Sequence, residues 1–105
     1  MTAYVCSDLL TQAPVPAQGI LSRTLLDDAT LRIVVLAFSA GHELSAHSTP
    51  RPVVIQILSG SARVRLGDET HDMKAGSLAR LPSGLEHAVT ALEPTTLLLT
   101  MEKAA

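Results

Sequence analysis

The sequence predicts an all-β domain, and three observations point to this fold class. Short segments rich in valine, isoleucine, leucine and threonine recur along most of the chain. Pairs of turn-forming residues, most of them with glycine or proline, separate these segments at short and fairly regular intervals. No part of the chain shows the alternation of strands and long helices that is typical of parallel sheets, so we expect a β-sandwich or β-barrel.

The first 18 residues are expected to form an N-terminal arm, and residues 19–105 a single domain. One helical turn could begin at Ser7. Pro14 and Pro16 prevent this turn from extending, because proline lacks the amide hydrogen that a helix requires. Beyond Gly19 the sequence pattern changes to that of a strand, a turn and a second strand.

Strand-forming segments make up the predicted domain, and alternation of side chains indicates which faces they bury. The segments are residues 20–26, 31–38, 53–58, 62–67, 69–73, 77–81, 87–92 and 95–101. The run from Ile33 to Phe38 is apolar on both faces of a strand, which indicates burial on both sides, either inside a sandwich or at an interface between subunits. We therefore expect a homodimer.

Composition excludes several classes of function. The net charge is −2 and aromatic residues make up only 2% of the chain, so neither a phosphate-binding surface nor base stacking is expected and no nucleic acid partner is predicted. The single cysteine, Cys6, allows no disulfide within the chain. The first ten residues lack the features of a signal peptide and no apolar run could span a bilayer, so we expect a cytoplasmic protein without a membrane partner.

Two stretches place histidines among turn-forming residues at defined spacings. In the first, Gly41 is followed after five residues by His47, and the stretch ends at Gly60. The second stretch holds Gly76, Pro82, Gly84 and His87. Together they resemble the two motifs of a small single-domain cupin. This resemblance covers roughly residues 19–101 and implies a double-stranded β-helix (jelly-roll) barrel of the RmlC-like superfamily, with the first 18 residues as a short arm.

In metal-binding cupins, two histidines and a glutamate from the first motif and one histidine from the second hold iron, manganese, nickel or zinc. The resemblance assigns His47 and His87 as candidate metal ligands. The chain departs from the pattern elsewhere, because the second histidine falls on Thr49, the glutamate on Val53 and the final asparagine on Ala91. Two histidines alone make a weak site, since catalytic zinc usually keeps three protein ligands. A divalent transition metal and a metal-free pair of histidines therefore both remain open.

A pocket is expected around the two histidines even without a metal. Its candidate lining residues are Thr49, Val53, Gln56 and Glu43. Glu43 shares strand parity with His47, whereas Gln56 would face away from His47 unless the nearby prolines shift the register. His42 and His71 are expected to be ordinary surface histidines. Met101 is expected to fill the core.

Three functions are compatible with these features. The first is a cupin that binds a small molecule in its barrel, with a reduced or absent metal site. The second is a metal-dependent enzyme of the dioxygenase or isomerase type that uses His47 and His87 with non-standard ligands. The third is a structural or dimerisation module. Val53 favours the first function, because valine cannot bind a metal.

Overall fold

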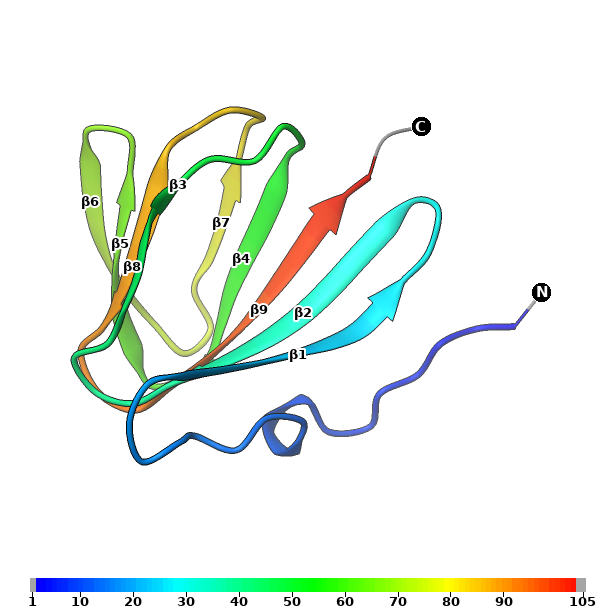
Figure 1. The fold of residues 1–105 in the computed structure, drawn as a ribbon, viewed down its shortest axis with the longest axis horizontal. Coiled ribbons are helices and arrows are strands. Elements are labelled where there is room, and N and C mark those ends of the chain that lie inside the picture. The colour runs from blue at the N-terminus through cyan, green and yellow to red at the C-terminus, as the bar shows by residue number, and fades with distance from the viewer. Residues whose placement is uncertain (1, 104–105) are drawn as a thin grey trace.

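The computed structural model describes residues 2–103, and its regular secondary structure is almost entirely β-strand (Figure 1). One short 3₁₀ helix, η1 (Leu9–Thr11), precedes them. The strands are β1 (Ile20–Asp27), β2 (Leu31–Phe38), β3 (Glu43–His47), β4 (Val53–Ser59), β5 (Ser61–Leu66), β6 (Glu69–Lys74), β7 (Leu78–Leu81), β8 (His87–Ala91) and β9 (Thr95–Glu102). The predicted all-β jelly-roll barrel is confirmed.

Two antiparallel sheets face each other. The first has the strand order β1-β2-β9-β4-β7 and the second the order β3-β8-β5-β6. In Figure 1 the sheets come together at the lower end and splay apart at the upper end. The connections β3–β4 and β7–β8 both cross this upper end, which we call the mouth of the barrel.

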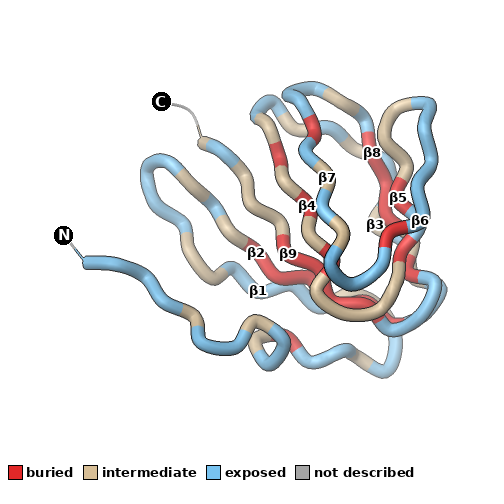
Figure 2. The backbone as a smooth tube through the Cα atoms, turned by 180° about the vertical axis from the view of Figure 1, so that it is seen from behind, coloured by how far each residue is buried: buried red, intermediate tan, exposed pale blue. Residues whose placement is uncertain are grey.

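Alternating side chains from both sheets fill the space between them. Val34, Leu36 and Phe38 of β2 point inward, as do Val53, Ile55 and Ile57 of β4. Figure 2 shows such buried positions in red along the inner strands, while the arm and the loops are mostly pale blue. With only one phenylalanine in the chain, branched aliphatic residues supply this core, and each buried side chain of this size contributes about 1.5–3 kcal/mol.

The other face of β2 is covered by the N-terminal arm. Val35 and Ala37 are fully buried there against Leu98 of β9 and Ala13 of the arm. The Asp8 side chain caps η1 by accepting a hydrogen bond from the Leu10 amide at 3.0 Å. The prediction that this strand is buried on both sides is thus confirmed, and one chain supplies the cover for both faces.

Among residues 2–103, no helix has both the length and the apolar character needed to cross a membrane.

The structure also contains one strand that the pattern of apolar residues did not delimit. This is β3, in which Ser45 and Ala46 are exposed and the pairing with β8 shifts register between Leu44 and His47. An irregular strand of this kind shows no clean alternation of polar and apolar residues.

Candidate functional site

The two motif histidines meet at the mouth of the barrel. His47 is the last residue of β3 and His87 the first of β8, and the two residues are direct cross-strand partners. Their ring centroids lie 4.3 Å apart with the ring planes tilted by 56°. His87 is 3% exposed and His47 is half-buried. His87 shares its inner face with Val89 and Ala91, so the pair stands above the apolar core.

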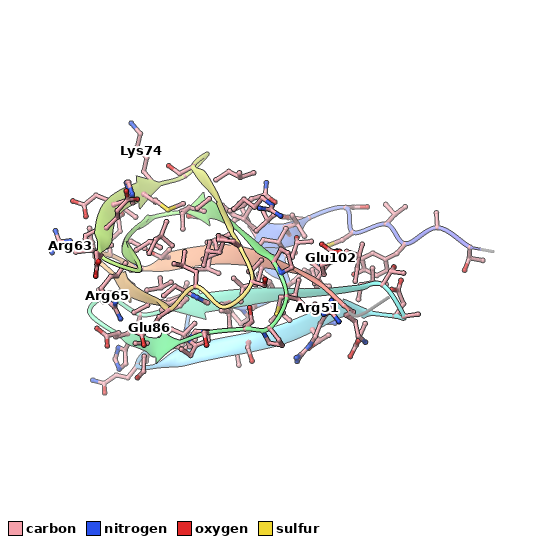
Figure 3. All side chains as sticks on the ribbon, turned by 90° about the horizontal axis from the view of Figure 1, so that it is seen from above. Arg51, Arg63, Arg65, Lys74, Glu86 and Glu102 are labelled. Carbon is pink, nitrogen blue, oxygen red and sulfur yellow. The ribbon has the colours of Figure 1, made fainter. Side chains whose placement is uncertain are left out.

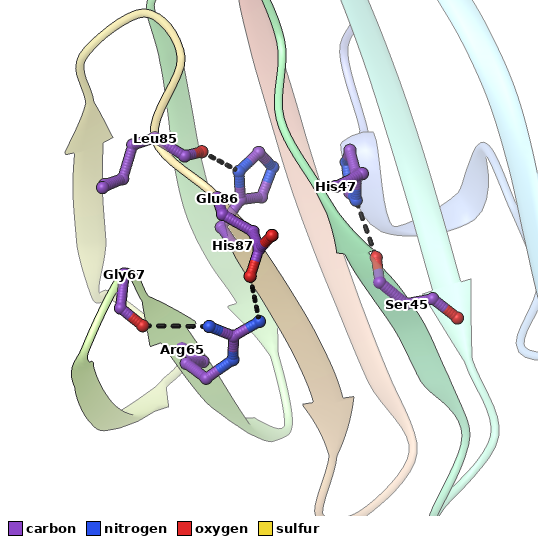
Figure 4. A network of polar contacts seen from close by, with 7 residues as sticks. All are labelled: Ser45, His47, Arg65, Gly67, Leu85, Glu86 and His87. Carbon is purple, nitrogen blue, oxygen red and sulfur yellow. Dashed lines mark hydrogen bonds and ion pairs between the residues drawn. The ribbon is translucent and has the colours of Figure 1, made fainter.

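Backbone carbonyls fix the orientation of both imidazoles (Figure 4). His47 Nδ1 lies 2.8 Å from the Ser45 carbonyl oxygen, and His87 Nδ1 lies 2.9 Å from that of Leu85. A carbonyl oxygen can only accept a hydrogen bond, so Nδ1 carries the proton in both rings. In the neutral form each Nε2 then keeps a lone pair, which is available to a ligand.

A cavity of about 450 Å³ opens at the same end of the barrel. Its apolar surface includes Val53 at the start of β4 and Met101 near the end of β9. These two residues pair directly across the sheet, and Arg32 of β2 pairs with Met101 on its other side. The remaining lining residues are Thr49, Pro50, Arg51, Glu102 and Lys103. His47 and His87 are not among them, so the expectation that the pocket surrounds the two histidines is wrong for this cavity.

Hydrogen bonds between loops hold the mouth in shape. The Gly84 amide of the β7–β8 loop donates to the Thr49 carbonyl of the β3–β4 loop at 2.8 Å. The Thr49 hydroxyl donates to the Arg51 carbonyl at 2.9 Å, and the Lys103 amide donates to the Thr30 carbonyl at 2.9 Å. Because the loops are tied to one another, the cavity is largely pre-formed.

Of the four residues predicted to line the pocket, the structure brings Thr49 and Val53 to the cavity, whereas Glu43 and Gln56 are not among its lining residues. Glu43 is exposed, and its carboxylate accepts a hydrogen bond from the Thr90 hydroxyl at 3.1 Å. The register shift in β3 reverses the parity on which its predicted position rested. Gln56 alternates with the inward-facing Ile55 and Ile57, so it points out of the barrel.

The remaining histidines lie outside this site. His71 is exposed and bonds to Glu69, as expected of a surface histidine. His42 differs from the expectation, because it is half-buried with its Nδ1 2.7 Å from the Ser39 hydroxyl oxygen. Ser39 also accepts a hydrogen bond from the Gly19 amide at 2.9 Å, so this cluster joins the start of β1 to the β2–β3 turn.

Sequence reasoning missed several residues that line the cavity, among them Arg32, Glu102 and Lys103, and assigned another, Met101, to the core alone. The signal for Arg32 was present, since it has the same strand parity as Val34 and Leu36 and therefore points inward. A charged residue on the inner face of an otherwise apolar strand indicates the rim of a site.

The donor atoms at the mouth do not fit the four-ligand metal site of metal-binding cupins. Val53 is buried and has no donor atom, and the Thr49 hydroxyl is engaged by a carbonyl oxygen. Within the described part of the chain, no three or more histidine, cysteine, aspartate or glutamate side chains form a group that could hold a metal ion. The two Nε2 atoms are therefore the strongest potential metal ligands at the mouth.

Two carboxyl groups beside Lys103 have lowered pKa values. The ammonium group of Lys103 donates to the Asp27 carboxylate at 2.5 Å. This hydrogen bond, together with the positive charge of Lys103, lowers the pKa of Asp27. In the adjoining β1–β2 turn, the pKa of Asp28 is lowered because its carboxylate accepts hydrogen bonds from the amides of Thr30 and Leu31.

Comparison with known proteins adds independent evidence on the fold. A conserved protein of unknown function from Streptococcus pyogenes superposes with a TM-score of 0.89 at 30% identity, over 100% of this chain and 92% of that chain. An RmlC-like cupin from Desulfovibrio desulfuricans gives a TM-score of 0.85 at 23% identity, over 95% of this chain and 97% of that chain. A cupin superfamily protein from Desulfitobacterium hafniense gives 0.83 at 19% identity, over 87% and 84% of the two chains. No curated protein matches the chain in sequence.

A family model described as a cupin domain matches residues 34–101. The match begins in β2 and ends in β9, so it includes both motif histidines and most of the two facing sheets. The two solved structures with less than 25% sequence identity bear on the fold alone, and they agree with the jelly-roll topology described above. The chain belongs to the cupin family.

Proposed function

We propose that this cupin binds a small organic molecule in its mouth cavity and does so without a complete metal site. The observation that carries the proposal is the cavity itself, which has a volume of about 450 Å³ and an apolar floor of Val53 and Met101. Pockets for small molecules have volumes of about 300–1,000 Å³ and combine apolar walls with a few polar groups. Such a domain would sense or sequester a metabolite.

Val53 supports binding rather than metal-dependent catalysis. It stands at the position where the cupin motif has a glutamate ligand, and in the structure it contributes an apolar side chain to the cavity. A bound molecule can place its apolar part against Val53. Its polar groups can bind the charged side chains that line the same cavity, among them Arg32 and Arg51, whereas His47 and His87 do not line it.

The test is a fragment screen by ligand-observed NMR, followed by titration of the hits into variants. Val53→Phe fills the cavity floor and should abolish binding. Val54→Phe is the matched control, because Val54 is on the same strand but points out of the barrel. Met101→Trp is a second blocking variant at a half-buried position. Hits that bind equally well to Val53→Phe and Met101→Trp, or no hits at all, would overturn the proposal.

The metal content of the purified protein is a separate test. We expect elemental analysis of untagged protein to find well below one iron, manganese, nickel or zinc ion per chain, because two imidazoles are too few ligands for tight binding. A stoichiometric ion that disappears in the His47→Ala/His87→Ala double variant would contradict the metal-free part of the proposal.

A further inference from the structure

The charge at the mouth is opposite in sign to that of the whole chain. The cavity lining holds three cations, Arg32, Arg51 and Lys103, and a single acid, Glu102, whereas the chain has a net charge of −2. Seen from above in Figure 3, Arg51 and Glu102 lie on one side of the barrel and Arg63, Arg65 and Glu86 on the other. Because Asp27 pairs with Lys103, the cations of the lining that carry no ion pair in the described part of the chain are Arg32 and Arg51.

Two of the cavity cations have no partner among residues 2–103. On the opposite side of the barrel, Arg63 pairs with Asp72 and Arg65 with Glu86, both at 3.0 Å. No hydrogen bond or ion pair involves the guanidinium group of Arg32 or Arg51 within the described residues. A guanidinium group presents a planar fork of donors that matches a carboxylate.

The backbone around Arg32 limits where its side chain can go. β2 is hydrogen-bonded on both edges at this level, with Asp27 of β1 on one side and Met101 of β9 on the other. Asp27 is the nearest potential partner across the sheet, but Lys103 engages its carboxylate. The charge of Arg32 also contributes to lowering the pKa of Asp27, but no hydrogen bond or ion pair joins the two side chains, so the guanidinium donors of Arg32 remain free on the inner side of β2 in the described structure.

We infer that the ligand of the mouth cavity is a monoanionic organic carboxylate, whose carboxylate group binds Arg32 and Arg51 and whose apolar body lies on Val53 and Met101. This inference rests on the proposed function and specifies its ligand class. The apolar floor selects against inorganic anions, because a fully hydrated ion gains nothing from it. Glu102 repels a second negative charge and so favours a monoanion over a phosphate monoester, which carries nearly two charges at neutral pH.

Matched pairs of probes test the inference by isothermal titration calorimetry at low ionic strength. The carboxylates are 4-methylpentanoate and benzoate, the neutral analogues are 4-methylpentanamide and benzamide, and phenyl phosphate is the dianion. We expect each carboxylate to bind at least tenfold more tightly than its amide and more tightly than phenyl phosphate. Carboxylates that bind no better than their amides, or phenyl phosphate as the tightest probe, would overturn the inference.

Arginine variants locate the anion. Arg32→Gln and Arg51→Gln should each weaken carboxylate binding about fivefold or more, with little change for the amides. Arg80→Gln is the matched control, because Arg80 is exposed on β7 with no partner in the described chain and does not line the cavity. Glu102→Gln should tighten carboxylate binding two- to threefold. All four positions are exposed, so the variants should fold, and thermal melts check this.

The outcomes separate this inference from the proposed function. If Val53→Phe abolishes the binding of neutral and anionic probes alike and the arginine variants change nothing, the cavity binds small molecules but not through a carboxylate. If no fragment or probe binds in a way that Val53→Phe affects, the proposed function itself fails. Equal losses in Arg32→Gln and Arg80→Gln would show that only the overall charge matters, which also overturns the inference.

Discussion

Gly60 and Gly76 belong to the two cupin motifs, and the structure predicts different consequences for their replacement by alanine. Gly60 joins β4 to β5 with φ +84°, and a Cβ atom there would lie 2.2 Å from the Pro94 carbonyl oxygen. Gly76 has φ +94°, but a Cβ atom would have no neighbour within 4 Å. Both substitutions strain the backbone, and only Gly60→Ala also forces a collision.

The expected losses of stability follow from backbone strain and from the steric collision. A positive φ disfavours alanine by about 1–2 kcal/mol at either site. At Gly60 the collision adds about 1–3 kcal/mol, as for overpacking in a core. Thr95 is also close to the added atom, and its position is fixed by a hydroxyl that lies 2.8 and 2.7 Å from the carbonyl oxygens of Ser61 and Glu93, between which it shares its single proton.

Urea and thermal unfolding, followed by circular dichroism, measure the difference. We expect Gly60→Ala to lower the free energy of unfolding by about 2–5 kcal/mol and Gly76→Ala to lower it by about 1–2 kcal/mol. Each 1 kcal/mol lowers the melting temperature of a domain of this size by about 4–8 °C. Equal losses for the two variants would refute the reasoning, because the close approach of Pro94 to Gly60 would then have no energetic effect.

Three further predictions concern metal, acid and assembly. Thr49→His/Val53→Glu completes the ligand set of the motif, so elemental analysis after zinc loading should find clearly more metal per chain than in the wild type; an unchanged content would contradict the assigned positions. Lys103 lowers the pKa of Asp27 below its ordinary value of 3.8, so the Asp27 carboxylate stabilises the fold above about pH 4 and this contribution disappears as the pH falls through the lowered value. The difference in urea stability between wild type and Asp27→Asn should therefore shrink on acidification from pH 7 to pH 2, and a constant difference would rule out this linkage. The expected homodimer has lost part of its support, because the arm of the same chain covers the outer face of β2; light scattering at micromolar concentration tests it, with twice the chain mass for a dimer and a monomeric mass against it.

Much of the fold could be predicted from the sequence because local chemistry marks its boundaries. Glycines occupy every left-handed backbone position in the described chain, and most of them lie at or next to a strand boundary. In β5, for example, strict alternation of arginine with apolar residues matches the structure, in which Val64 is buried and Arg63 and Arg65 are not. β3 was harder to delimit, because its exposed residues and its register shift obscure the alternation on which such predictions depend.

The candidate site was less predictable, because it forms only when the two sheets face each other. The spacing of the motifs identified His47 and His87, which the structure pairs across β3 and β8. Their hydrogen bonds to carbonyl oxygens depend on local backbone geometry that spacing does not reveal. Glu43 was misplaced because a shift of one residue moves a side chain to the opposite face of a strand.

The rows of inward-facing residues explain how a complete cupin barrel can carry an incomplete metal motif. Ile55 and Ile57 of β4 and Leu97 of β9 lie below the mouth and are almost fully buried, so the stability of the barrel depends on them. Val53 and Met101 form the next row up, beside Arg32, where one side of each residue faces the cavity. Residues in this upper row can exchange a metal ligand for an apolar or cationic side chain while the rows below stay packed. The chemistry of the ligand is therefore decided in a single layer of the barrel, the layer that the arginine and valine variants change.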